Sequence, residues 1–207
     1  MKQLTYYILV PALVLAAAFL YLLFAGEADA SAVRDQVVRF HVVAKDNSQE
    51  AQALKLKVRD GVFALVEQLF APCESREEAL GVAEEQQEIL QAEAERILLE
   101  NGCHEPVTVE VGERFFPTKD YGSLSFPAGR YQALSIRIGE AKGENFWCVL
   151  YPALCVSPAV ADEAGESEMI AVVGEEQNAF LKKSAPTQKI KFALVEWMKQ
   201  LMEKLRK

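Results

Sequence analysis

The stretch VVRFHVVA, residues 37–44, is short and rich in β-branched residues, which predicts a β-strand. The polar run 45–48 (KDNS) ends this strand. Asn47 with Glu50 three residues later is typical of the pair of side chains that begins a helix. Apolar residues then recur at helical spacing, at Leu54, Val58, Val62, Leu65 and Leu69. We therefore expect the strand to be followed by a helix over residues 49–70.

A second helix is expected from Ser75 to about Glu100. Ser75 with Glu78 is a pattern that favours a helix start, and the pair 101–102 (Asn-Gly) favours its end. Residues 74–100 hold nine Glu and two Arg, a net charge of -7. Two interpretations stay open: a solvated outer face of the domain, or a docking surface for a basic partner.

Beyond this helix the hydrophobic pattern changes to a period of two residues, which is typical of strands. Strands are predicted around residues 107–111 and 134–138, and a third over 146–151 that completes an antiparallel meander. Residues 115–129 contain turn signals at Pro117 and Pro127 and are expected to form a loop. The acidic segment near 160–177 is expected to be a solvated loop, in which 169–173 could form a short strand.

The chain is expected to end in a basic amphipathic helix near 187–206. Residues 182–207 carry eight bases and two acids, a net charge of +6. Packing on the sheet, with Trp197 in the apolar stripe, is one interpretation; contact with an anionic membrane or an acidic partner is the other. The elements together predict an α+β fold: a small, mostly antiparallel sheet of about four strands, covered by two consecutive helices and this C-terminal helix.

The N-terminus contains an uncharged apolar run, residues 4–24. Lys2 precedes it and acidic residues follow it, a charge asymmetry that favours export of the chain beyond the run. We expect residues 1–30 to be a signal peptide or a membrane anchor, and residues 31–207 to be a single exported domain. The length of the run favours an anchor, whereas the small residues at 28–32 (ADASA) favour cleavage.

The net charge of the whole chain is -8, from 22 Lys plus Arg against 30 Asp plus Glu. This balance argues against wholesale binding of nucleic acid, because phosphates are neutralised by clustered basic side chains. The aromatic content of 9% and the many aliphatic residues exclude a disordered chain.

Four cysteines in an exported chain suggest a disulfide. Cys148 and Cys155 are the candidate pair, because six residues that include Pro152 separate them. Cys73 and Cys103 flank the second predicted helix, whose length would hold them too far apart to bridge, so they are taken as free or unassigned.

The residues that could carry catalysis are few. His41 lies in the first strand and is expected to be a structural residue with satisfied hydrogen bonds, and His104 lies in a turn beside Cys103. Neither metal-ligand spacing nor a phosphate-binding or nucleophile motif occurs in the sequence. We therefore expect no catalytic residue, no metal and no cofactor, and a protein that is not an enzyme.

Three long segments resemble the stage II sporulation protein R family: residues 39–60 (RFHVVAKDNSQEAQALKLKVRD), 116–155 (FPTKDYGSLSFPAGRYQALSIRIGEAKGENFWCVLYPALC) and 189–198 (KIKFALVEWM). The resemblance implies a signalling protein that is made in the forespore and exported into the space between forespore and mother cell, where it is secreted or anchored. It implies as partner a membrane-embedded aspartic protease of the mother cell, which processes the precursor of the early mother-cell sigma factor. It implies no catalytic residues.

The surface that would contact such a protease is expected on the loop 116–127 and on the strand that carries Trp147, because turns on a rigid sheet commonly hold recognition residues. The partner-contact candidates are Phe116, Pro117, Thr118, Tyr121 and Trp147. Packing of these aromatic residues onto the sheet is the alternative. Two rival functions also stay open: a cell-envelope hydrolase or wall-binding module, which would need a cleft with paired carboxylates, and a structural scaffold at the septum.

Overall fold

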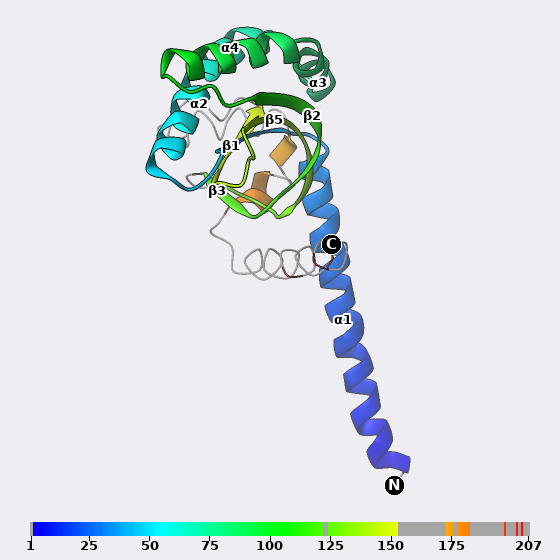
Figure 1. The fold of residues 1–207 in the computed structure, drawn as a ribbon. Coiled ribbons are helices and arrows are strands. Elements are labelled where there is room, and N and C mark those ends of the chain that lie inside the picture. Colours follow the sequence, from blue (N-terminus) through cyan, green and yellow to red (C-terminus); the bar gives the residue numbers. More distant parts are fainter. Residues whose placement is uncertain are drawn as a thin grey trace.

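The computed structural model describes residues 2–121, 124–152, 173–175 and 178–182, together with Trp197, Met202 and Lys204 (Figure 1). Its elements, in chain order, are α1 (Lys2–Arg34), β1 (Val38–Val43), α2 (Gln49–Phe70), α3 (Arg76–Glu85), α4 (Gln87–Glu100), β2 (Val107–Phe116), β3 (Lys119–Tyr121), β4 (Leu124–Phe126), β5 (Gly129–Ile138) and β6 (Asn145–Tyr151). Most of the predicted acidic loop and of the C-terminal helix lies outside the described residues. Trp197, which would be buried if this helix packed on the sheet, is 61% exposed.

The main sheet has four strands in the order β2-β5-β1-β6. β5 pairs with β2 antiparallel and with β1 parallel, and β1 pairs with β6 antiparallel. The predicted α+β fold with a mostly antiparallel sheet is confirmed, but the predicted meander is wrong, because β1 lies between β5 and β6. β1 takes this central place because five of its six residues are buried, so the strand needs cover on both faces and neighbours on both edges.

The connection 139–144 between β5 and β6 passes over the end of β1. The N–H of Gly143 donates to the carbonyl of Ala44 (2.9 Å), and the N–H of Glu144 donates to Oδ1 of Asn47 (2.6 Å). A Cβ on Gly143 would lie 2.2 Å from the carbonyl oxygen of Asp46, so only glycine allows this approach. The side chain of Asn47 therefore holds the connection in place. The sequence predicts Asn47 as the N-cap of α2, but the N-cap is Ser48, whose side chain accepts a hydrogen bond from the N–H of Ala51.

The helix predicted over 49–70 is confirmed as α2, and Ser75 caps the following helix as expected. The continuous helix predicted from Ser75 to Glu100 is wrong, because Gln86 (φ -98°, ψ 8°) separates α3 from α4. The break lets each short helix bury its own apolar side chains: Ala79 and Ala83 on α3, and Leu90, Ala94, Ile97 and Leu98 on α4.

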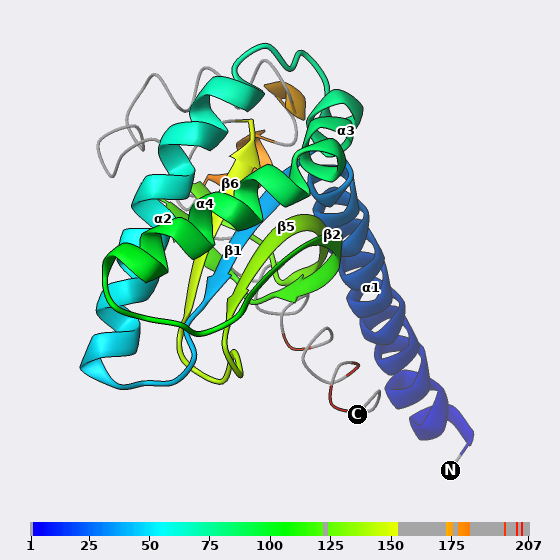
Figure 2. The ribbon, with the colours of Figure 1, turned by 45° about the horizontal axis from the view of Figure 1, so that its top comes forward.

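The three helices α2, α3 and α4 cover one face of the sheet, and Figure 2 shows α2 and α4 crossing in front of it. We call the core beneath them the helix-side core. Its sheet residues are mainly aliphatic, and α2 and α4 contact each other at Gly61, where a Cβ would lie 2.4 Å from Cδ1 of Ile97. Gly61 thus lets α2 and α4 approach each other closely.

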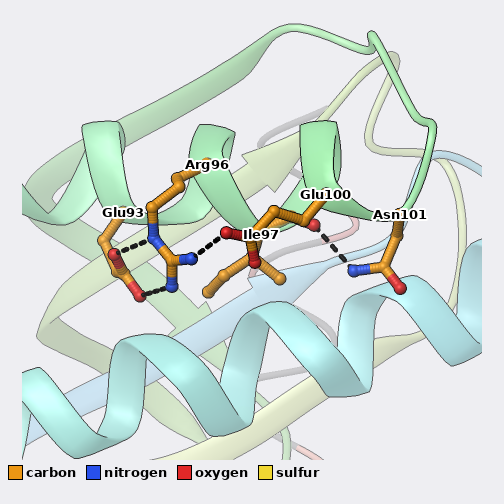
Figure 3. Close-up of polar contacts among 5 residues, drawn as sticks. All are labelled: Glu93, Arg96, Ile97, Glu100 and Asn101. Carbon is orange, nitrogen blue, oxygen red and sulfur yellow. Dashed lines mark hydrogen bonds and ion pairs between the residues drawn. The ribbon is translucent and has the colours of Figure 1, made fainter.

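The side of α4 next to α2 carries the ion pairs shown in Figure 3. Arg96 donates to both carboxylate oxygens of Glu93 (2.7 and 2.8 Å) and to Glu100. The side chain of Asn101 donates to the carbonyl of Ile97 (2.8 Å) and so caps the end of the helix. Part of the predicted acidic surface is therefore neutralised within α4.

The opposite face of the sheet is covered by the β3–β4 hairpin, by the end of α1 and by residues from the 173–182 region. We call this second cluster the hairpin-side core. It contains Ala30, Val33, Val37, Phe116, Leu124, Phe126, Tyr131, Ala133, Val149, Val173, Phe180 and Leu181. The predicted loop 115–129 is thus largely strand, because β2 continues to Phe116 and the hairpin follows at once.

Helix α1 joins the domain only at its end. Ala30 and Val33 are fully buried, and Arg34 pairs with Glu27 (2.5 Å). The rest of α1 projects away from the sheet in Figure 1 and exposes apolar side chains, including Leu13, Leu15 and Tyr21. Within the part of the chain that the structure describes, no helix is both long enough and apolar enough to cross a membrane. The boundary expected after residue 30 falls inside α1.

Candidate functional site

The hairpin-side core is built around one charged residue, Arg39 of β1, which is fully buried. Its guanidinium carbon lies 4.5 to 5.7 Å from the centres of four aromatic rings, those of Phe116, Tyr121, Phe126 and Tyr131. At these distances the negative ring faces attract the positive charge, and the attraction is strongest where water is excluded.

The hydrogen bonds of Arg39 join three separate segments. Nε donates to the carbonyl of Cys148 on β6 (2.9 Å), and Nη2 donates to the hydroxyl of Tyr121 on β3 (2.9 Å). Among the described residues no carboxylate pairs with this guanidinium, and its Nη1 has no hydrogen-bond partner. The aromatic rings therefore supply most of the interactions that hold the charge inside the domain.

A second aromatic contact lies next to Arg39 on the same face. The ring of His41 stacks on Trp147, with centroids 4.1 Å apart and an angle of 2° between the planes, and lies 5.8 Å from Phe116. Burial lowers the pKa of His41 to about 4, so the ring is neutral at pH 7. His41 is a structural residue, as expected, and is held mainly by this stacking. The side chain of Asn145 interacts with the ring and opposes the lowering of its pKa, but neither ring nitrogen has a partner at full hydrogen-bonding geometry in the described part of the chain.

The structure brings the five partner-contact candidates to this one face. Phe116 is fully buried and contacts Trp147 edge to face, with centroids 4.7 Å apart. Pro117, Thr118, Tyr121 and Trp147 are half-buried, so part of each side chain reaches the surface. Only these four present atoms that a partner could touch, whereas Phe116 supports them from inside.

Side-chain hydrogen bonds hold the hairpin in place. Oγ1 of Thr118 accepts from the N–H of Ala128 (3.2 Å), and the hydroxyl of Tyr131 donates to the carbonyl of Pro127 (2.6 Å). Burial raises the pKa of Tyr131 to about 12, so its hydroxyl remains a donor at pH 7. These hydrogen bonds fix the position of the hairpin beneath the half-buried candidate residues.

The cysteines divide into two groups. Cys73 and Cys103 are free and half-buried, and burial raises the pKa of the Cys73 thiol. Cys148 is buried on β6, whereas Cys155 lies outside the described residues. The disulfide between Cys148 and Cys155 therefore stays a prediction.

The paired carboxylates that a hydrolase would need are not found among four acidic residues on and beside the sheet, which interact with other side chains. Glu110 pairs with Arg114, and Glu113 pairs with Arg130 (3.3 Å). Asp120 accepts from the hydroxyl of Ser125 (2.6 Å), and Glu140 pairs with Lys142 (2.7 Å). Within the described ranges, no group of three or more His, Cys, Asp or Glu side chains could hold a metal ion. This arrangement does not favour an acid–base pair.

Sequence reasoning missed the residues at the centre of this face: Arg39, Phe126 and Tyr131. A charged residue inside the otherwise apolar segment 37–44 was the available signal, since a buried charge needs specific partners. Its partners come from β2, β3, β4 and β5, and no local pattern brings these strands together.

Comparison with known proteins points in one direction. The sequence model of the family "Stage II sporulation protein R (spore_II_R)" matches residues 34–161, a range that begins at the last residue of α1 and includes every strand described above. The chain is also 29% identical, over 185 residues, to "Stage II sporulation protein R" of Bacillus subtilis (strain 168), and the match covers 82% of this chain and 83% of that protein. No solved structure matches the chain.

Proposed function

Because the chain belongs to the stage II sporulation protein R family, with its role in sporulation, we propose that it is an exported forespore signal that activates a membrane-embedded aspartic protease of the mother cell. The activated protease then cleaves the precursor of the early mother-cell sigma factor. The observation that carries this proposal is the family match across residues 34–161, because it spans the whole four-stranded sheet and all the candidate contact residues.

In this proposal the chain acts by binding and is not an enzyme. A ligand shifts the equilibrium of its target only when it binds one state of the target better than the other. The domain therefore needs a surface with a fixed shape. The hairpin supports this role, since Arg39 and Tyr131 tie it to the sheet while Tyr121 and Trp147 stay partly accessible.

Export is the second part of the proposal. It is supported by the uncharged run at residues 4–24, which follows Lys2, and by the exposed apolar side chains within that run. The packing of Ala30 and Val33 into the hairpin-side core bears on where the chain could be cleaved after export. A cleavage after Ala30 would remove Glu27, the ion-pair partner of the buried Arg34, so an uncleaved or earlier-cleaved chain would keep the domain more stable.

The first experiment is deletion of the gene in the sporulating host. We expect the sigma-factor precursor to accumulate uncleaved in the mother cell, and processing to return when the gene is restored. Normal processing without the gene would contradict the proposed function.

The second experiment tests the contact surface. Tyr121→Ala removes a half-buried ring of the hairpin, and Leu99→Ala removes an exposed apolar side chain of α4 on the other side of the molecule as a matched control. The Tyr121 ring also contacts Arg39, so some loss of thermal stability is expected from Tyr121→Ala. We expect this variant, but not Leu99→Ala, to reduce processing by more than the loss of folded protein accounts for. If processing falls only in proportion to lost thermal stability, Tyr121 has a packing role and the contact surface lies elsewhere.

A further inference from the structure

Strand β2 forms one edge of the four-stranded sheet. The carbonyl of Pro106 accepts from the N–H of Gly139 beyond the end of β5 (2.8 Å), whereas the N–H of Val109 points to Oε1 of Gln91 on α4 (3.4 Å). Backbone groups of successive residues in a strand point to opposite sides. The even-numbered residues of β2 therefore bond to β5, and the odd-numbered residues, including Val111 and Glu113, direct their backbone N–H and C=O groups away from the sheet.

This outward edge is only lightly protected. Gln91 occupies the position beside Val109, and the carbonyl of Glu113 accepts from Nη1 of Arg114 (3.2 Å). No described strand other than β5 pairs with β2. An edge with free backbone groups is a template for pairing with another strand.

The charges beside this edge are arranged symmetrically about Gly112. Glu110 and Arg114 lie two residues before and two residues after it, and their side chains share one face of β2. They form an ion pair with each other across the glycine, and both side chains remain more than one third exposed. The Arg114 guanidinium lies beside this glycine, since Nη1 of Arg114 would be at 3.9 Å, an ordinary contact distance, from a Cβ built on Gly112.

We propose that a second copy of this chain pairs antiparallel with β2 across a two-fold axis at Gly112, forming one continuous sheet from two domains. In this register Val111 lies opposite Glu113 of the second copy. The backbones of these two residues exchange N–H···O=C hydrogen bonds, and the two-fold axis repeats this pair on the other side of Gly112. Glu110 lies opposite Arg114 of the second copy in the closer, non-hydrogen-bonded kind of pair, where opposite charges stabilise the ladder. The two Gly112 residues face each other on the axis and bring no side chains to clash.

The charge pattern selects a second copy as the partner. A two-fold contact joins the same surface of both molecules, so the surface must be complementary to itself. Only an axis at Gly112 sets Glu110 opposite Arg114, because any other axis along β2 pairs these residues with different positions. A short ladder buries less than the roughly 1,200 Å² of a stable interface, so the dimer is expected to be weak and to depend on concentration. The inference goes beyond the proposed signalling function and does not depend on it.

The test uses charge reversal on the full chain, kept soluble in a mild detergent and examined by sedimentation equilibrium. Glu110→Arg places Arg opposite Arg in the dimer, and Arg114→Glu places Glu opposite Glu, so we expect each variant alone to dimerise about tenfold more weakly than the unmodified chain. An equimolar mixture of the two variants should restore dimerisation, since each interchain pair then joins Arg to Glu. The ion pair within each chain stays broken in the mixture, so a purely intramolecular role of Glu110 and Arg114 predicts no restoration.

Two further variants test the role of the β2 backbone and control for charge reversal elsewhere on the surface. Glu113→Pro removes an outward N–H while leaving the bonds between β2 and β5 intact, and we expect it to weaken dimerisation with little change in thermal stability. Arg96→Glu reverses an ion-paired arginine on α4 and should leave dimerisation unchanged. A chain that stays monomeric at all concentrations, a dimer insensitive to Glu113→Pro, or a mixture that fails to restore association would each overturn the proposal.

Discussion

The two faces of the sheet are held by different physical means, although β1 contributes to both. On the helix side, Phe40 and Val42 of β1 join a mainly aliphatic core that includes Val58, Val62 and Ile136. On the hairpin side, Arg39 and His41 of the same strand meet aromatic rings at set distances and angles. Aliphatic packing depends mainly on volume, whereas cation–π contacts and hydrogen bonds also depend on direction. The hairpin side, whose contacts depend on direction, is the side that supports the candidate contact residues.

The largest expected effect comes from removing the charge at the centre of the hairpin side. Arg39→Ala leaves a cavity among four rings and leaves the carbonyl of Cys148 and the hydroxyl of Tyr121 without their donor. We expect a loss of about 3–5 kcal/mol in the free energy of unfolding, measured by urea denaturation. The matched change on the helix side, Val62→Ala, should cost about 2 kcal/mol, the lost burial of a smaller side chain.

A further variant shows whether direction or volume matters at position 39. Arg39→Met keeps an unbranched side chain of similar length but has no donors. We expect Arg39→Met to be less stable than the unmodified chain. Equal stability, with unchanged amide protection of the β3–β4 hairpin, would mean that only the volume of the side chain at position 39 matters and that the two faces of the sheet are stabilised in the same way.

The second effect is a pH dependence confined to the hairpin side. The pKa of His41 is about 4 in the folded chain and 6.5 in the unfolded chain, so the unfolded state binds the proton more readily between these values. The stability due to the neutral ring is complete above pH 6.5 and is lost as the pH falls toward 4. From pH 7 to pH 5 we expect a loss of about 2 kcal/mol, measured as the change in the free energy of unfolding.

His41→Phe keeps an aromatic ring against Trp147 and cannot take up a proton. The difference between the two chains, followed from pH 7 to pH 5, isolates the contribution of His41 from that of the carboxylates. Parallel curves for the two chains would mean that His41 is not the group that titrates.

The smallest effect concerns single hydrogen bonds, one on each side. Thr118→Val removes the acceptor of the Ala128 N–H on the hairpin side, and Ser48→Ala removes the cap of α2 on the helix side. Each should cost about 1 kcal/mol in the free energy of unfolding. Amide exchange separates them: the first should speed exchange at Ala128 and the second at Ala51, and loss of protection across the whole sheet in either variant would contradict this local assignment.

Local signals predicted the helices of this protein better than its sheet. α2 follows from apolar spacing within residues 49–70, and α3 from the Ser75 cap, which are both short-range features. The place of β1 between β5 and β6 depends on partners such as Ala133 and Cys148, about a hundred residues further along the chain, and no periodicity reveals them.

The candidate site shows the same division. Phe116, Tyr121 and Trp147 were found because long segments resemble a family. Their common support, Arg39, was missed, because the burial of a charge becomes understandable only when four strands bring their aromatic rings around it. The sequence predicts a loop in place of the hairpin, because Pro117 and Pro127 are strong turn signals whereas strands of three residues are too short to show an alternating pattern.

The central place of β1 has a consequence for the newly made chain. β1 leaves the ribosome early, but its neighbours β5 and β6 follow only after residue 128, roughly 5–20 s later at ordinary rates of translation. Until then a mainly apolar segment has both backbone edges unpaired, a state that invites association with other chains. Arg39 and His41 interrupt this segment with polar groups, and such interruptions lower the tendency of an apolar strand to associate with other chains before β6 is made.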